Sequence, residues 1–170
     1  ISQTGYYLVF DSSEIPVVGI KASGVKGINL KDDILISGIS FDESDEYINI
    51  FTNHRTAKRI KISDLSIGSR AKKGSTLMKK VKTVDYKILS AYKASAKDII
   101  CIKADSEIRE EKNSELPIMD LTSTGSNISK YDIDGSFVRT ELESFLNKKK
   151  KETEVKESDD SIKEEQIVEN

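Results

Sequence analysis

The amino-acid sequence predicts an all-β fold built from a repeated unit of about 50 residues, followed by a short helix and a charged tail. Short runs rich in β-branched and aromatic residues alternate with turn residues, as in antiparallel strands joined by hairpins. One residue frame also recurs three times along the 170 residues of the chain. Repeated units of short strands at this period are typical of a propeller-like array with one blade per repeat.

Six runs of residues predict strands, because each is too short and too β-branched to favour a helix. Apolar residues change to roughly helical spacing only near the C-terminal end, where the segment 136–148 predicts one short amphipathic helix. The predicted strands lie at residues 6–10, 33–41, 47–52, 58–62, 87–92 and 98–104.

The repeat frame combines a Ser-acid-aliphatic triplet with a glycine ten residues after the acidic residue. Glycine is expected where the backbone needs a positive φ or approaches another strand closely. The frame divides residues 1–146 into blades at about 1–46, 47–97 and 98–146. The triplets are Ser13-Glu14-Ile15, Ser63-Asp64-Leu65 and Ser114-Glu115-Leu116, and the glycines are Gly24, Gly74 and Gly125.

The segment 147–170 is almost entirely charged or polar, so it cannot bury enough apolar surface to offset the entropy lost on ordering. We predict a disordered tail that acts as a solubilising end. The competing hypothesis is an acidic DNA mimic that folds back on the basic part of the chain. With 6 Lys and 8 Asp or Glu, its net charge of −2 supports that hypothesis only weakly.

Charge is distributed unevenly along the chain, although the total net charge is only −2. Residues 51–100 contain 13 Lys or Arg and 3 Asp or Glu, which gives a net charge of +10. The flanking segments 1–50 and 101–146 each have a net charge of −5. Such a local excess is typical of a surface for a polyanion, and the competing interpretation is an ordinary solvated face.

No combination of residues predicts catalysis or a metal site. His54, the only histidine, has no recognisable catalytic partner and is expected in a turn near phosphates. The single Cys101 excludes an intramolecular disulfide and predicts a small buried apolar side chain. Acidic clusters at 32–33 and 42–46 do not have the spacing of a calcium loop and predict turns. Without a signal peptide or a run of 18 apolar residues, we expect a cytoplasmic piece of a longer chain.

Two consecutive segments resemble a known family. They are "EIPVVGIKASGVKGINLKDDILISG" (14–38) and "IFTNHRTAKRIKISDLSIGSRAKKG" (50–74). Together they resemble the C-terminal domain that bacterial type IIA topoisomerases carry on their A subunits, over about residues 1–135. The stretch "GVKGINLK" before an acidic turn is closer to the topoisomerase IV protein (ParC) than to its counterpart in DNA gyrase (gyrase A). The glycine- and arginine-rich box of gyrase is absent from the sequence.

The resemblance implies a β-pinwheel, a propeller-like disc of four-stranded blades that exchange strands with their neighbours. Its positively charged perimeter would bind and bend double-stranded DNA, and so guide segment selection for ATP-dependent strand passage in relaxation and decatenation. This segment would be non-catalytic and hold no cofactor or metal, because the catalytic tyrosine, ATP and Mg²⁺ belong to other domains of such enzymes. The topoisomerase IV B subunit (ParE) and a second ParC chain would be partners through other parts of the chain, near the bacterial nucleoid.

The charge distribution and the resemblance together predict a DNA-binding surface centred on the middle repeat. The Lys58-Arg59 pair is replaced by Leu8-Val9 and by Arg109-Glu110 in the other repeats, so the positive charge belongs to this repeat and not to the frame. The predicted DNA-binding residues are Lys21, Lys26, Arg55, Lys58, Arg59, Lys61, Arg70, Lys72, Lys73, Lys79, Lys80 and Lys82.

These residues would neutralise duplex phosphates without reading sequence, since few aromatic residues are available nearby for stacking on single strands. Two alternatives remain open. One is a propeller-type protein-interaction scaffold that docks an acidic partner on the basic surface. The other is the equivalent domain of DNA gyrase A.

Overall fold

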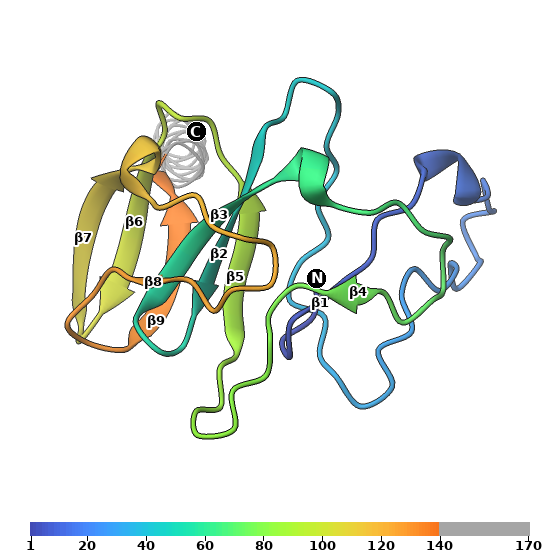
Figure 1. Cartoon of the computed structure of the whole chain (residues 1–170). Helices are drawn as coiled ribbons and strands as arrows, with labels where there is room; N and C mark the ends of the chain where they lie inside the picture. Colours follow the sequence, from blue (N-terminus) through green and yellow to red (C-terminus); the bar gives the residue numbers. More distant parts are fainter. Residues whose placement is uncertain (140–170) are drawn as a thin grey trace, which may run out of the picture.

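The structure is a computed structural model, and it describes residues 1–139. This part of the chain consists of β-strands and single-turn 3₁₀ helices joined by irregular loops, which confirms the predicted all-β fold (Figure 1). None of its helices is long and apolar enough to cross a membrane. The strands are β1 (Tyr6–Tyr7), β2 (Tyr47–Thr52), β3 (Thr56–Lys61), β4 (Ser75–Thr76), β5 (Ile88–Lys93), β6 (Ile99–Ala104), β7 (Glu107–Lys112), β8 (Ser126–Asn127) and β9 (Ile133–Val138), and the 3₁₀ helices are η1 (Ser12–Glu14), η2 (Ile62–Asp64) and η3 (Asn113–Glu115).

The strands form three antiparallel sheets. A four-stranded sheet has the order β5-β2-β3-β8, a three-stranded sheet has the order β7-β6-β9, and β1 pairs with β4. In each of the two larger sheets a tight hairpin, β2–β3 or β6–β7, is joined by a later strand, β5 or β9, that pairs with its first strand. The third repeat therefore reproduces the arrangement of the second, as the repeat frame predicts.

Strand β2 is buried on both faces and separates two hydrophobic clusters. Ile48 and Ile50 point into the first cluster with Leu77, while Phe51 points into the second with Ile100. Side chains alternate across a strand, so one strand can supply both clusters. Because each cluster contains residues of two repeats, the core forms between repeats and not within them.

The repeat frame corresponds to one recurring local geometry. Each triplet forms a 3₁₀ turn in which the aliphatic residue donates its backbone N–H to the carbonyl three residues earlier: Ile15 to Ser12, Leu65 to Ile62 and Leu116 to Asn113. Each glycine has a positive φ: +80° at Gly24, +87° at Gly74 and +91° at Gly125.

We name the residues between the triplet's aliphatic position and the strand after the glycine an arm: arm 1 is 15–26, arm 2 is 65–76 and arm 3 is 116–127. Arm 2 ends in β4, which pairs with β1 of the first repeat, and arm 3 ends in β8, which pairs with β3 of the second. A side chain at Gly74 would collide with the Tyr7 carbonyl oxygen, so this approach requires glycine. The predicted exchange of strands between neighbouring repeats is therefore present.

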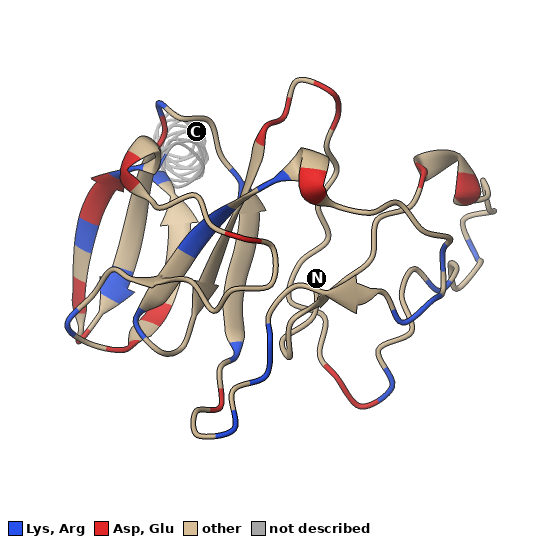
Figure 2. Cartoon of the chain, in the orientation of Figure 1, with Lys and Arg blue, Asp and Glu red and all other residues tan. Residues whose placement is uncertain are grey.

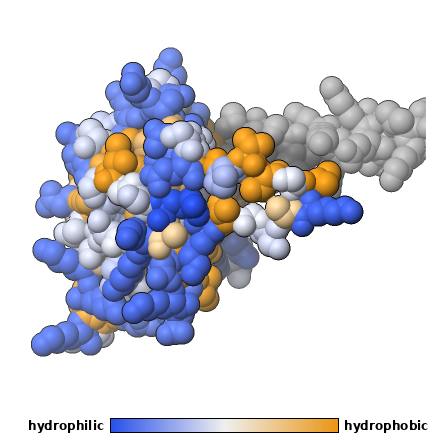
Figure 3. Space-filling model, turned by 90° about the vertical axis from the view of Figure 1, so that its right-hand side faces the viewer, coloured by the Kyte–Doolittle hydropathy of each residue, from blue (hydrophilic) through white to orange (hydrophobic). Residues whose placement is uncertain are grey.

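Arm 1 has the same geometry, but no described hairpin covers it. Val17 and Ile20 are fully exposed, and no atom lies within 4 Å of the Cβ position at Gly24. In Figure 1 the arm projects away from the sheets, and Figure 3, viewed from that side, shows hydrophobic residues among the hydrophilic ones. Arm 1 is thus an unpartnered copy of arms that are seated elsewhere in the same structure.

One predicted strand is absent, and the predicted start of the helix is wrong. Residues 33–41 form no strand and make only an isolated bridge, Leu35 to Ser2. The equivalent strand β5 pairs with β2 over most of its length, whereas 33–41 shares backbone hydrogen bonds only with Ile1 and Gln3 among the described residues outside the segment's own turn. Residues 136–138, predicted as the start of a helix, belong to β9. The rest of that helix and the tail at 147–170 lie outside the described residues.

The frame position shared by Leu116 and Ile15 provides a matched test of arm seating. Leu116 is buried to 1% exposure and Ile15 is 51% exposed. We expect Leu116→Ala to lower the free energy of unfolding by about 2–4 kcal/mol, through lost burial and a residual cavity, and Ile15→Ala to change it by less than about 0.5 kcal/mol. Urea unfolding of the two variants measures the difference, and equal losses would contradict the exchanged arrangement.

Candidate nucleic-acid interface

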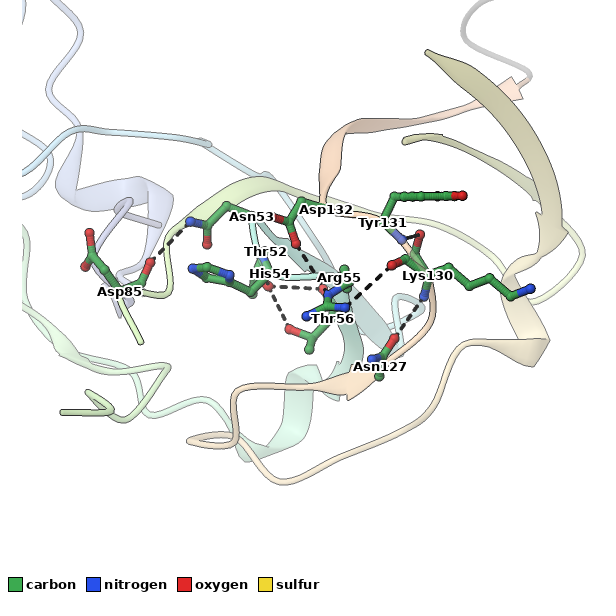
Figure 4. Close-up of polar contacts among 11 residues, drawn as sticks. Thr52, Asn53, His54, Arg55, Thr56, Asp85, Asn127, Lys130, Tyr131 and Asp132 are labelled. Atoms are coloured by element: carbon green, nitrogen blue, oxygen red, sulfur yellow. Dashed lines mark hydrogen bonds and ion pairs between the residues drawn. The ribbon is translucent and has the colours of Figure 1, made fainter. Parts of the chain in front are cut away.

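The turn of the β2–β3 hairpin lies between two loops and is held by both of them (Figure 4). On one side, Asn53 donates from Nδ2 to the Asp85 carbonyl at 3.2 Å and accepts at Oδ1 from the Lys87 backbone N–H at 2.7 Å. On the other side, Arg55 forms an ion pair with Asp132, with 3.4 Å between Nε and Oδ1. These contacts fix the turn, and the exposed Arg55 lies at its tip with φ of +59°.

His54 lies in this turn, as predicted, with its ring edge-on to Tyr86 at 5.2 Å between centroids. No group of three or more His, Cys, Asp or Glu side chains that could hold a metal ion occurs in residues 1–139. Cys101 is buried, which confirms its predicted packing role. Within the described residues, the turn offers a charged surface and no catalytic arrangement.

The prediction that Lys58 contacts DNA is wrong, because its side chain is only 1% exposed. Its ammonium group donates hydrogen bonds to the carbonyl oxygens of Leu77 at 2.9 Å, Leu121 at 2.7 Å and Ser123 at 2.7 Å. Burial lowers the pKa of Lys58 to about 8, and the Asp120 carboxylate partly opposes this shift. Lys58 is therefore a structural cation that connects arm 3 to Leu77, the residue after arm 2.

The same correction applies to Arg59, which is 7% exposed. Its guanidinium donates from Nε to the Leu116 carbonyl at 2.8 Å and from a terminal nitrogen to the Ser114 carbonyl at 2.9 Å. The same group lies 5.1 Å from the centroid of the Tyr47 ring, a cation–π distance. With its donors directed at protein groups, Arg59 has no surface to offer a phosphate.

Arg70 is half-buried and connects arm 2 to arm 1. It donates from Nε to the Glu14 carbonyl at 3.2 Å and from a terminal nitrogen to the Lys26 carbonyl at 2.7 Å. Its backbone N–H donates to the Glu14 carboxylate at 2.9 Å. Its contact with DNA stays a prediction, and the structure gives it a role in positioning arm 1.

The other predicted residues are exposed and occupy the arms, the hairpin and the loop after β4. Figure 2 shows basic residues along these segments, whereas β7 of the third repeat carries mainly acidic ones. The Lys73 ammonium lies 4.4 Å from the Tyr6 ring centroid, so its position is fixed by a cation–π contact. The exposed set is Lys21, Lys26, Arg55, Lys61, Lys72, Lys73, Lys79, Lys80 and Lys82.

Two of these lysines, Lys73 and Lys80, also line a recess of about 270 Å³ whose wall includes the acidic residues Asp32 and Asp33. The sequence prediction missed Lys130, an exposed residue whose carbonyl accepts a hydrogen bond from Arg55 at 3.5 Å. Lys130 occurs in a segment with a net negative charge, so no local sequence signal marks it. The fold alone brings it to the hairpin turn.

Strand-exchanged β-repeats with basic arms define a propeller-like module of the β-pinwheel type. The chain belongs to the family described as DNA gyrase C-terminal domain, beta-propeller, whose model matches residues 1–41 and 46–92. Among curated proteins it is 34% identical to the DNA topoisomerase 4 A-subunit of Bacillus subtilis over 124 residues, covering 72% of this chain and 15% of that protein. It is 33% identical to the Streptococcus pneumoniae protein of the same name over 146 residues, covering 76% and 18%.

Solved structures agree with this assignment. The C-terminal domain of DNA topoisomerase IV superposes with a TM-score of 0.74 at 29% identity, over 81% of this chain and 45% of that one. The DNA gyrase A C-terminal domain gives a TM-score of 0.69 at 19% identity, over 81% and 48%, and supports the fold alone. The chain thus spans less than a fifth of its curated relatives and about half of the solved domains.

The lowered pKa of Lys58 predicts a rise in stability with pH. Between about pH 8 and its ordinary pKa of 10.5 the unfolded chain binds more protons than the folded one, so the free energy of unfolding increases as pH rises through this window. Relative to Lys58→Met, we expect wild-type protein to gain about 2 kcal/mol between pH 7.5 and pH 10. Urea unfolding at both pH values measures this gain, and a constant difference would contradict it.

Proposed function

We propose that this chain is a DNA-binding and DNA-bending module of a topoisomerase IV protein of the ParC type. The observation that carries the proposal is the distribution of its exposed cations over arms 1 and 2 and the loop after β4, with the acidic third repeat beside them. Lysines at these positions would neutralise backbone phosphates and release counterions, which gives affinity without sequence selectivity.

The arrangement of the repeats is the reason for proposing that the chain bends DNA as well as binding it. Cations on consecutive units of a curved array would contact successive phosphates only if the duplex followed that curvature. In the parent enzyme the bent segment would be presented for ATP-dependent strand passage, whose catalytic tyrosine, ATP, Mg²⁺, B subunit (ParE) and second ParC chain would belong to other parts of the complex. This role implies a location beside the bacterial nucleoid.

The second candidate function is a protein-interaction scaffold, which the exposed apolar residues of arm 1 favour. Val17 and Ile20 form the kind of apolar surface that a protein partner covers. The equivalent domain of DNA gyrase A is a further alternative, but the chain shares more identity with the topoisomerase IV domain than with the gyrase A domain.

The salt dependence of DNA affinity tests the proposal. Replacing Lys72 and Lys73 by Gln removes two exposed charges, so we expect the slope of log affinity against log salt to fall by about 2. Fluorescence anisotropy with a labelled duplex at several salt concentrations measures this slope. Lys103→Gln with Lys112→Gln is the matched control on the acidic third repeat and should leave the slope within about 0.5 of its original value.

Two outcomes would contradict the proposal. Absent or salt-insensitive binding by the wild-type chain would favour the scaffold function. Equal effects of the two double variants would mean that affinity follows total charge and not the proposed surface.

A further inference from the structure

We propose that Lys58 and Arg59 are positioning residues that set the path of bound DNA, although neither can contact it. They hold the third repeat to the second through hydrogen bonds to backbone carbonyls. This inference rests on the proposed function, because the path of DNA matters only if the chain binds it.

Lys58 connects the second repeat to the third. Its three hydrogen bonds reach Leu77, which follows β4, and Leu121 and Ser123 of arm 3. Leu77 also donates its backbone N–H to the Gly5 carbonyl of the first repeat at 2.7 Å. A charged ammonium has three N–H donors, and all three are used here to link arm 3 to the residue that follows arm 2.

Arg59 holds the beginning of arm 3 in the same way. Its backbone N–H donates to the Pro117 carbonyl at 2.7 Å, and its carbonyl accepts from Met119 at 3.0 Å. Its side chain adds the bonds to Ser114 and Leu116, so the arm is held by backbone and side chain together. Lys58 then holds the second half of the arm.

At the joint between the first and second repeats, Leu8 and Val9 occupy the positions of Lys58 and Arg59. The cation at that joint is Arg70, which donates to the Glu14 and Lys26 carbonyls from arm 2 and not from the hairpin. Val9 bridges Ile67 as Arg59 bridges Ile118, and the Val9 carbonyl accepts from Gly68 at 2.7 Å. The backbone arrangement is therefore the same at both joints, and cations on the hairpin are not needed to seat an arm. Their presence at one joint gives it extra hydrogen bonds that restrict the orientation of the third repeat.

The orientation of the third repeat relative to the second sets the positions of the exposed cations on these two repeats relative to one another. Lys72, Lys73 and Lys80 belong to the second repeat, whereas the exposed Lys130 belongs to the third, where its backbone carbonyl accepts a hydrogen bond from Arg55 of the hairpin turn. A duplex that contacts both groups of cations follows the angle between these repeats. Loosening the joint would therefore reduce bending without removing a phosphate contact.

The experiment compares Lys58→Met and Arg59→Lys with Lys61→Met in the 170-residue chain at pH 7. Lys61 is the matched control, because it lies on the same strand β3 but is exposed. Energy transfer between dyes at the two ends of a duplex measures bending, and anisotropy measures the salt slope. For both joint variants we expect the protein-induced change in transfer to fall by about half, with the slope changed by less than about 0.3.

Lys61→Met should behave in the opposite way, with a slope lower by about 1 and unchanged transfer at saturation. Circular dichroism establishes whether each variant folds. If Lys58→Met does not fold, Arg59→Lys alone tests the inference, because this variant keeps the positive charge and loses only the paired hydrogen bonds of the guanidinium. Unchanged bending by the folded joint variants, or a slope reduced by about 1, would overturn this inference. Absence of DNA binding by the wild-type chain would instead overturn the proposed function.

Discussion

The close approach of each seated arm to the hairpin of the preceding repeat is the constraint on which the structure depends. The Tyr7 carbonyl occupies the space for a side chain at Gly74, and the Ala57 carbonyl occupies it at Gly125. Both glycines have a positive φ, which glycine adopts at no steric cost because it has no Cβ, so the backbone of the arm can approach the hairpin closely. Because β4 and β8 each pair with a strand of the preceding repeat, part of the stability arises at the contacts between repeats.

The sequence could predict features that the backbone geometry demands in every repeat. The triplets and glycines recur because each 3₁₀ turn and positive φ recurs, and β2, β3, β5 and β6 lie close to their predicted positions. Residues 33–41 show why propensity is insufficient. Their pattern favours an extended strand, but a strand needs a partner, and among the described residues outside its own turn the segment pairs only with the short stretch 1–4, through one bridge and a few hydrogen bonds.

The candidate site was less predictable than the fold, because exposure depends on distant segments. Alternation along β3 places Lys58 on the same face as the buried Ile60, so a signal for its burial was present. Arg59 shares its face with the exposed Lys61, but it contacts the Tyr47 ring and the carbonyls of Ser114 and Leu116, which lie more than 50 residues away in the sequence. A count of charge in residues 51–100 therefore combined two populations that the fold separates.

These two populations respond differently to solvent. Exposed lysines on the arms are screened by salt, and their interactions with phosphate weaken as ionic strength rises. Lys58 and Arg59 are buried against backbone carbonyls, where screening is much weaker. Under the proposed function, salt conditions that release DNA would leave the joint between repeats intact, and the surface would not have to be reordered before DNA binds again. A preformed geometry of this kind lowers the entropic cost of binding. A basic surface on rigidly joined repeats therefore loses less conformational entropy on binding than a flexible basic segment would.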